Sequence, residues 1–228
     1  MRPQSLPSLS QFCRRVKTPR LHAIIDRVHE LLAGLDEHVA LAFIDGKALP
    51  ISESSKDPDA RTGRGNGRFS RGYKLHGLSD SLGRIRAFRV TPMNEGEPTV
   101  AREYLVQHLT KGAVVMADGN YDGKKLYTAV GLQEAFLFTP QKKNHRTEAA
   151  FKRTCPERRQ AMEVWRDRPL LARAAYRLRT GIERTFSALS CHRNGLGPLP
   201  AWVRRIERVT RWVTAKIALY NARVILRH

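Results

Sequence analysis

The sequence predicts an α/β fold in which a mixed central sheet is flanked by helices. Three short apolar runs of strand length, 39–44, 113–117 and 135–139, alternate with amphipathic segments of helical spacing. Two further apolar runs, 72–78 and 85–90, enclose a polar turn and indicate a β-hairpin. Elements in this order pack as a sheet with helices on its faces.

The chain of 228 residues is long enough for one domain with a sizeable core. Residues 1–40 predict a short basic arm followed by a helix, since Thr18 and Pro19 are typical of a helix start and apolar residues then recur at helical spacing. Residues 41–228 are expected to form the main domain.

The connections and later helices complete this domain. Residues 50–70 are rich in Ser, Gly and Arg without an apolar period and predict a loop. Helices are expected at 97–109 and 121–130. A basic insertion or loop, partly helical, is expected at about 140–170. Helices at 172–189 and about 201–227 then follow, with Trp202 among the expected core positions of the last one.

The charge balance is strongly basic: 41 Lys plus Arg face 21 Asp plus Glu, a net charge of +20. Nucleic acid is the commonest partner of such a surface, because each neutralised phosphate releases counterions; an acidic protein or a membrane surface is the alternative. No apolar run reaches membrane-spanning length, and no signal peptide is recognisable. The three cysteines show no CxxC spacing. We therefore expect a cytoplasmic, nucleoid-associated protein.

Two apolar strands run directly into Asp-Gly, at Asp45 and at Asp118. On a late helix, Tyr176, Arg179 and Glu183 follow one another at steps of three and four residues, which places them on one helix face. Either aspartate alone is explained equally well as a turn former. Together, three carboxylates match a two-metal phosphoryl-transfer site, because Mg²⁺ and Mn²⁺ prefer carboxylate oxygens.

The other polar residues take their expected roles from their place in the predicted elements. The aspartates outside the strand ends are expected to be structural: Asp57, Asp59, Asp80 and Asp122. The basic residues of 50–70 either track a phosphate backbone or form a solvated loop. The basic residues predicted to contact DNA are Arg68, Arg71, Lys74, Lys142, Lys143 and Arg193, and the last helix offers a further basic face.

Five segments carry a family resemblance, the last of them the most specific: IDGKALP (44–50), SKDPDARTGRG (55–65), GYKLHGL (72–78), ADGNYDG (117–123) and YRLRTGIERTFSAL (176–189). From about Phe43 to its end the chain resembles insertion-sequence transposases of the DDE type. One group of these carries Tyr, two residues, Arg, three residues, Glu, six residues, Lys.

The resemblance implies an RNase H-like fold, with residues 41–228 as the catalytic domain. It implies Asp45, Asp118 and Glu183 as catalytic and metal-binding residues for two Mg²⁺ ions, which Mn²⁺ can replace. It implies that Tyr176 and Arg179 contact DNA or brace the Glu. The implied activity is cleavage at element ends followed by strand transfer of the 3′-OH into target DNA, by a homodimer on DNA.

Two departures from the family pattern leave alternatives open. Ser190 stands where the group carries Lys, so that one expected phosphate contact is absent, with His192 or Arg193 as replacements. The region before Asp45 is shorter than is usual in the family. The alternatives are therefore a metal-dependent nuclease that only hydrolyses, and an inactive or truncated transposase-derived DNA-binding protein.

Overall fold

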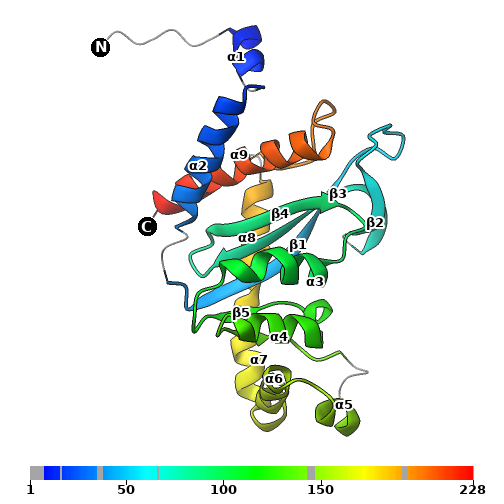
Figure 1. The fold of residues 1–228 in the computed structure, drawn as a ribbon, viewed down its shortest axis with the longest axis vertical. Coiled ribbons are helices and arrows are strands. Elements are labelled where there is room, and N and C mark those ends of the chain that lie inside the picture. Colours follow the sequence, from blue (N-terminus) through cyan, green and yellow to red (C-terminus); the bar gives the residue numbers. More distant parts are fainter. Residues whose placement is uncertain are drawn as a thin grey trace.

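The computed structural model describes residues 8–15, 17–34, 38–65, 67–142, 147–191 and 195–227. Within these residues six strands form one mixed sheet with helices on both faces (Figure 1), as predicted. The strands are β1 Leu41–Pro50, β2 Arg61–Gly65, β3 Arg68–Asp80, β4 Ile85–Pro92, β5 Val114–Met116 and β6 Phe136–Phe138. The α-helices are α1 Leu9–Arg15, α2 Pro19–Ala33, α3 Glu97–Val100, α4 Lys124–Leu132, α5 Glu148–Lys152, α6 Pro156–Asp167, α7 Pro169–Tyr176, α8 Thr180–Ser190 and α9 Ile206–Ile225.

Strand β1 joins the antiparallel and parallel parts of the sheet. On one side it pairs antiparallel with β3, and on the other it pairs parallel with β5, which pairs parallel with β6. The outer edge of β3 is shared, since β2 pairs with its first part and β4 with the rest. The predicted hairpin at 72–78 and 85–90 is thus confirmed as the core of β3 and β4.

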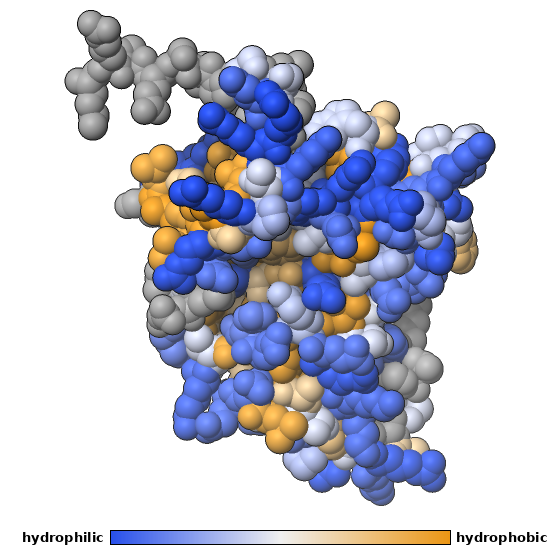
Figure 2. Space-filling view, turned by 45° about the horizontal axis from the view of Figure 1, so that its top comes forward, coloured by the Kyte–Doolittle hydropathy of each residue, from blue (hydrophilic) through white to orange (hydrophobic). Residues whose placement is uncertain are grey.

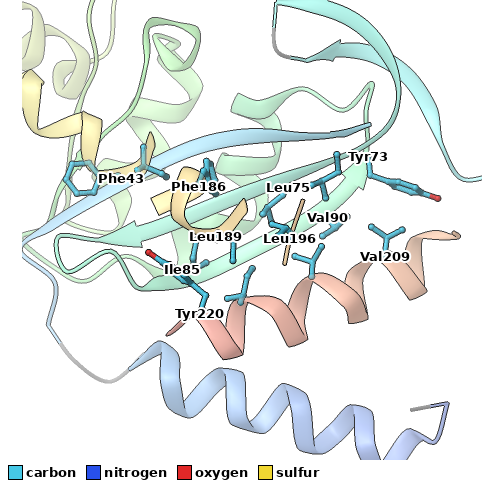
Figure 3. Packing of buried hydrophobic residues seen from close by; sticks show 14 of the residues in the cluster. Phe43, Tyr73, Leu75, Ile85, Val90, Phe186, Leu189, Leu196, Val209 and Tyr220 are labelled. Atoms are coloured by element: carbon cyan, nitrogen blue, oxygen red, sulfur yellow. The ribbon is translucent and has the colours of Figure 1, made fainter. Parts of the chain in front are cut away.

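The sheet separates two hydrophobic clusters. Side chains alternate between the faces of a strand, so Phe43 points to one cluster while Ala42 and Ile44 point to the other. The Phe43 side is covered by α8 and α9, and Phe186 and Leu189 of α8 pack against the sheet (Figure 3). The opposite side is covered by the helical turns Ala101–Leu105 and Val106–His108, which follow α3, and by α4 and α6.

Helix α2 begins as predicted. The Thr18 hydroxyl accepts a hydrogen bond from the Leu21 N–H, and Pro19 occupies the first turn. The helix ends at Gly34, whose φ of 59° places it in the left-handed region that glycine tolerates. It lies along α9 (Figures 1 and 3), and an Arg211 Nη1 is 2.9 Å from the His22 ring nitrogen Nε2. The N-terminal helix therefore packs on the body of the protein.

The prediction of a loop at 50–70 was wrong for the second half of that segment. Strand β2 and the start of β3 form a hairpin there, in which Arg64 pairs with Phe69. Most side chains of β2 are exposed, so the strand shows no apolar period. Backbone pairing and close glycine contacts shape it instead: a Cβ at Gly63 would lie 2.3 Å from the Met93 carbonyl oxygen.

The region at about 140–170 is an integral part of the fold rather than a basic loop. Its described part contains α5 and α6. Arg158 is buried and binds the buried Asp122 carboxylate through Nε at 2.6 Å and Nη2 at 3.0 Å. Trp165 stacks on Phe138 and donates to the Thr139 carbonyl. A buried ion pair and an aromatic side chain anchor this region, together with the buried Ala161 and Met162 of α6.

Two late helices differ from their predicted bounds. The helix expected at 172–189 is divided into α7, a 3₁₀ turn at Arg177–Arg179 and α8. The last helix begins at Ile206 rather than 201, and Trp202 is 67% exposed instead of buried. Its N-terminus is capped from a distance, since the Ile206 N–H donates to Asp59 Oδ2 at 3.0 Å.

Candidate active site

The two predicted strand aspartates lie at the same level of the sheet. The last parallel pair between β1 and β5 is Phe43 with Met116, and each aspartate follows two residues later. The sequence predicted that the first strand would end at Asp45. In the structure β1 instead continues to Pro50, paired with β3. Asp45 therefore lies where β5 has stopped, beside the chain that leaves β5 at Asp118.

Each aspartate is oriented by a nearby backbone amide. Asp45 Oδ1 accepts from the Gly46 N–H at 2.8 Å. Asp118 Oδ1 accepts from the Asn120 N–H at 2.8 Å and caps the 3₁₀ turn Gly119–Tyr121. These bonds fix the two side chains while leaving carboxylate oxygens available to other partners.

Helix α8 brings the third predicted carboxylate to this edge. Ile182, Phe186 and Leu189 are buried in the cluster on the Phe43 side of the sheet, which orients the helix. Glu183, on the outer side of the same helix, forms a hydrogen-bonded ion pair with Arg179 Nη2. The other terminal nitrogen, Nη1, lies 3.7 Å from Asp45 Oδ2.

Tyr176, Arg179 and Glu183 are thus confirmed as neighbours on one face, although a 3₁₀ turn separates the helices that carry them. The Arg179 guanidinium carbon lies 5.7 Å from the centroid of the Tyr176 ring. Trp165 packs edge-on against the same ring. The tyrosine supports the arginine, and the arginine connects Asp45 with Glu183.

Burial raises the pKa of Asp45 to about 6. The Gly46 N–H and Arg179 oppose this shift, while the nearby Asp118 and Glu97 add to it. The site therefore concentrates negative charge that a single guanidinium does not fully neutralise. Within the described ranges, no three acidic, histidine or cysteine side chains are yet gathered closely enough to hold a metal ion.

Glu97 is a fourth carboxylate at the site and was missed by the sequence interpretation. Its Oε1 is 3.0 Å from Lys74 Nζ, and its Oε2 accepts from the Asn120 amide at 3.3 Å. A Cβ at Gly46 would lie 2.8 Å from the same carboxylate. In the sequence Glu97 looks like an ordinary acidic residue in the first turn of a helix, and no local pattern connects it with Asp45 or Asp118.

The predicted DNA-binding residues are distributed over different surroundings. Lys74 is buried against Glu97 rather than exposed. Arg68 is exposed on the β2–β3 hairpin, whereas Arg71 is partly buried and donates to the Asp57 carbonyl at 2.7 Å. Lys142 is partly buried, with its backbone N–H on Asp122. Lys143, His192 and Arg193 lie outside the described residues.

Ser190, the departure from the family pattern, sits at the end of α8. Its hydroxyl donates to the Phe186 carbonyl at 2.7 Å. It lines an open hollow of about 550 Å³ together with Asp45 and Glu183. A hydroxyl engaged with its own helix supplies no positive charge there.

The aspartates predicted to be structural have partners within the fold, although Asp80 is the last residue of strand β3 rather than part of a turn. Asp80 binds Arg84, and Asp122 binds Arg158. Asp57 accepts from the Tyr73 hydroxyl at 2.6 Å. Burial alone would raise the Asp57 pKa, but its hydrogen bonds hold the pKa below the ordinary value.

The surface is largely hydrophilic on the face that Figure 2 presents. Figure 2 shows a face covered mostly by hydrophilic residues, which hydrophobic residues interrupt only in small patches. Among the helices in the described part of the chain, none combines the length and the apolar character that crossing a bilayer requires.

Comparison with known proteins agrees with this geometry. The family described as "Transposase DDE domain" matches residues 40–221. The transposase for insertion sequence element IS1106 of Neisseria meningitidis serogroup B is 33% identical over 105 residues, which are 44% of this chain and 35% of that protein. The chain thus spans about a third of that relative's length.

Two transposase structures match this chain, and the first of them is similar in fold. The piggyBac transposase synaptic complex with hairpin DNA matches with a TM-score of 0.56 and 13% identity, over 98% of this chain and 55% of that chain. The Mos1 transposase paired-end complex matches at a TM-score of 0.32 and 11% identity, over 80% of this chain and 61% of that one. The fold is RNase H-like, and the chain belongs to the transposase DDE domain family.

Proposed function

We propose that this protein is a DNA transposase that cleaves DNA at element ends and transfers the freed 3′-OH into target DNA. The observation that carries the proposal is the register of the sheet, which places Asp45 and Asp118 at the same level beside the Glu183 helix. Family membership and the charge of +20 support DNA as the substrate.

Asp45, Asp118 and Glu183 are the residues we assign to hold two Mg²⁺ ions, which Mn²⁺ can replace. Carboxylate oxygens are the donors these ions prefer. Bound at this edge, the ions supply an activated attacking oxygen and stabilisation of the leaving oxygen at phosphorus. The feature that would attract them is the group of neighbouring carboxylates, of which Asp118 and Glu97 add to the rise that burial causes in the Asp45 pKa.

Arg179 has two functions in this proposal. It braces Asp45 and Glu183 in the arrangement described here, supported by the Tyr176 ring. Its guanidinium presents fixed donors that suit a phosphate. Once the carboxylates have other positive partners, Arg179 is available to contact DNA at the reacting strand.

Three further assignments follow from the same proposal. The exposed basic residues, Arg68 among them, contact phosphates without reading sequence. A homodimer holds the two element ends together on DNA. The protein acts in the cytoplasm, on the nucleoid.

The experiment is cleavage of DNA that carries the gene's flanking terminal sequences, with Mg²⁺ or Mn²⁺ or with chelator. We expect metal-dependent cuts at the ends and joining of labelled 3′-OH ends to a plasmid, both absent in Asp118→Asn. Cutting without joining would reduce the proposal to a nuclease. Salt-sensitive binding without any cutting would contradict catalysis altogether.

A further inference from the structure

The β2–β3 hairpin carries positive charge and one exposed aromatic ring. Between Ala60 and Ser79 the sequence contains five Lys and Arg residues and no Asp or Glu. Phe69, which lies opposite Arg64 in the hairpin, is 73% exposed. Leaving a phenylalanine in water forfeits the stabilisation that its burial would give. The ring thus presents a large apolar face beside arginines.

The hairpin is anchored to the catalytic sheet. A Cβ at Gly63 would come within 2.3 Å of the Met93 carbonyl oxygen, and one at Gly65 within 2.6 Å of the Ala48 Cβ. Only glycine permits both contacts, since any side chain would push the hairpin away. The backbone that carries Phe69 is therefore held close to β1, the strand that carries Asp45.

A groove connects the hairpin with the active site. It has a volume of about 780 Å³ and lies between the hairpin and the turn that leads into α3. The active site contributes Asp118, Asn120 and Glu97 to its lining, and the hairpin contributes Arg64 and Phe69. Lys74 and Glu95 line it as well. The active-site carboxylates suit metal-bound phosphate, and the basic hairpin suits the next phosphates of the same strand.

The dimensions and the aromatic ring favour an unpaired strand as the occupant. The volume lies in the range of sites that enclose small ligands, about 300–1,000 Å³. A duplex, whose major groove alone is about 12 Å wide, is too large for it. Inside a duplex both faces of each base are covered by neighbours, whereas an unpaired base can stack on an aromatic side chain.

We propose that this groove binds a short unpaired segment of DNA next to the reacting phosphate, with one base stacked on Phe69 and a phosphate on Arg64. The proposal rests on the proposed function, because it takes Asp118 to mark the reacting phosphate. It adds a site for single-stranded DNA that distinguishes strand ends from continuous duplex.

The test compares two DNA probes on the full chain in an Asp118→Asn background, where no cleavage interferes. One is a blunt duplex, and the other is the same duplex with a short unpaired 3′ extension. We expect tighter binding of the extended probe, and Phe69→Ala should weaken that binding about 5- to 150-fold, since stacking on an aromatic is worth about 1–3 kcal/mol per base. Blunt-duplex affinity should not change.

Phe69→Trp, which restores an aromatic face, should keep the preference for the extension. Trp202→Ala is the matched control, because Trp202 is also an exposed aromatic but lies outside the groove. A 2-aminopurine in the extension should lose fluorescence on binding to Phe69-containing protein and not to Phe69→Ala. Equal effects of Phe69→Ala and Trp202→Ala, or unchanged 2-aminopurine emission, would overturn the proposal.

The two proposals fail separately. Phe69-dependent binding of the extension, without cleavage by the wild-type protein, would leave the single-strand site intact and remove the transposase activity. End cleavage that is unaffected by Phe69→Ala, with no preference for the extension, would leave the activity and remove the site.

Discussion

Asp118 and Asp122 stand four residues apart, each before a glycine, yet they have opposite surroundings. The Asp122 carboxylate is fully buried and is bound by Arg158 and by the Lys142 backbone N–H. Asp118 accepts a hydrogen bond from the Asn120 N–H. It lies near Asp45 and Glu183, and all three carboxylates interact with the one Arg179 guanidinium. A carboxylate with its own buried cation stabilises the fold, whereas carboxylates that share a cation leave charge for an external ligand.

The largest difference should appear when both aspartates receive the same substitution. Asp118→Asn should lower metal-dependent DNA cleavage at least about a thousandfold, because metal stabilisation is worth several kcal/mol and each 1.36 kcal/mol is tenfold in rate. Its free energy of unfolding should stay close to that of the wild type. The measurement is single-turnover cleavage alongside urea denaturation.

Asp122→Asn should show the reverse, with a free energy of unfolding lower by about 3–5 kcal/mol, because Arg158 is left buried with its main anionic partner removed. The double substitution Asp122→Asn with Arg158→Met should recover much of that loss. Urea denaturation followed by circular dichroism measures both. A stable Asp122→Asn protein that has lost cleavage would reverse our assignment of the two aspartates.

The contrast between these carboxylates was predictable only in part from the sequence. The positions of Asp45 and Asp118 follow from local patterns, because an apolar strand that ends in Asp-Gly is visible in a few residues. The cations are not visible in this way, since Arg158 reaches Asp122 from 36 residues away. The caps that start α9 come from Asp57 and Asp59, about 147 residues earlier.

The same limit explains the other errors. Glu97 joins the site because α3 and β3 meet there through Lys74, a contact that no spacing in the sequence reveals. The β2–β3 hairpin is specified by backbone pairing and by glycine contacts, for which a solvent-exposed sequence gives no periodic signal. Periodicity reports burial on one face, so elements fixed by ion pairs or by close backbone contact remain hidden from it.

Two buried groups on neighbouring strands should give pH dependences of opposite sign. Burial lowers the pKa of His76 to about 3, with Lys74 adding to the shift, and raises that of Asp45 to about 6. Between pH 4 and 6 the unfolded chain binds more protons at His76, so this residue makes stability rise with pH. Asp45 binds more protons in the folded state and makes stability fall with pH in the same range.

In the wild type the two effects on the pH dependence of stability should therefore partly cancel. Removing one of the two groups should leave the pH dependence that the other group causes. Asp45→Asn should leave stability rising between pH 4 and 6, and His76→Asn should leave it flatter or falling, by up to about 1.4 kcal/mol per pH unit for one proton. Urea denaturation at several pH values gives these slopes. Identical slopes in the two variants would show that neither group is buried as described.

The smallest effect should come from Glu97, which combines both kinds of carboxylate. It has a cation of its own in Lys74, yet it also raises the pKa of Asp45. Glu97→Gln keeps the size of the side chain and a hydrogen bond to Asn120 while removing its charge. The Asp45 pKa should then fall, and Mn²⁺ binding, which needs the ionised carboxylate, should develop at lower pH than in the wild type.

Calorimetric Mn²⁺ titrations between pH 5 and 7 measure that shift. Glu103→Gln is the matched control, because Glu103 is an exposed glutamate paired with Arg102 outside the site. An unchanged pH dependence in Glu97→Gln would mean that Glu97 serves only to neutralise Lys74, like Asp122 with Arg158. A shift to lower pH would mean that the charge of Glu97 raises the Asp45 pKa and so limits metal binding. The Lys74–Glu97 ion pair by itself does not distinguish these two roles of Glu97.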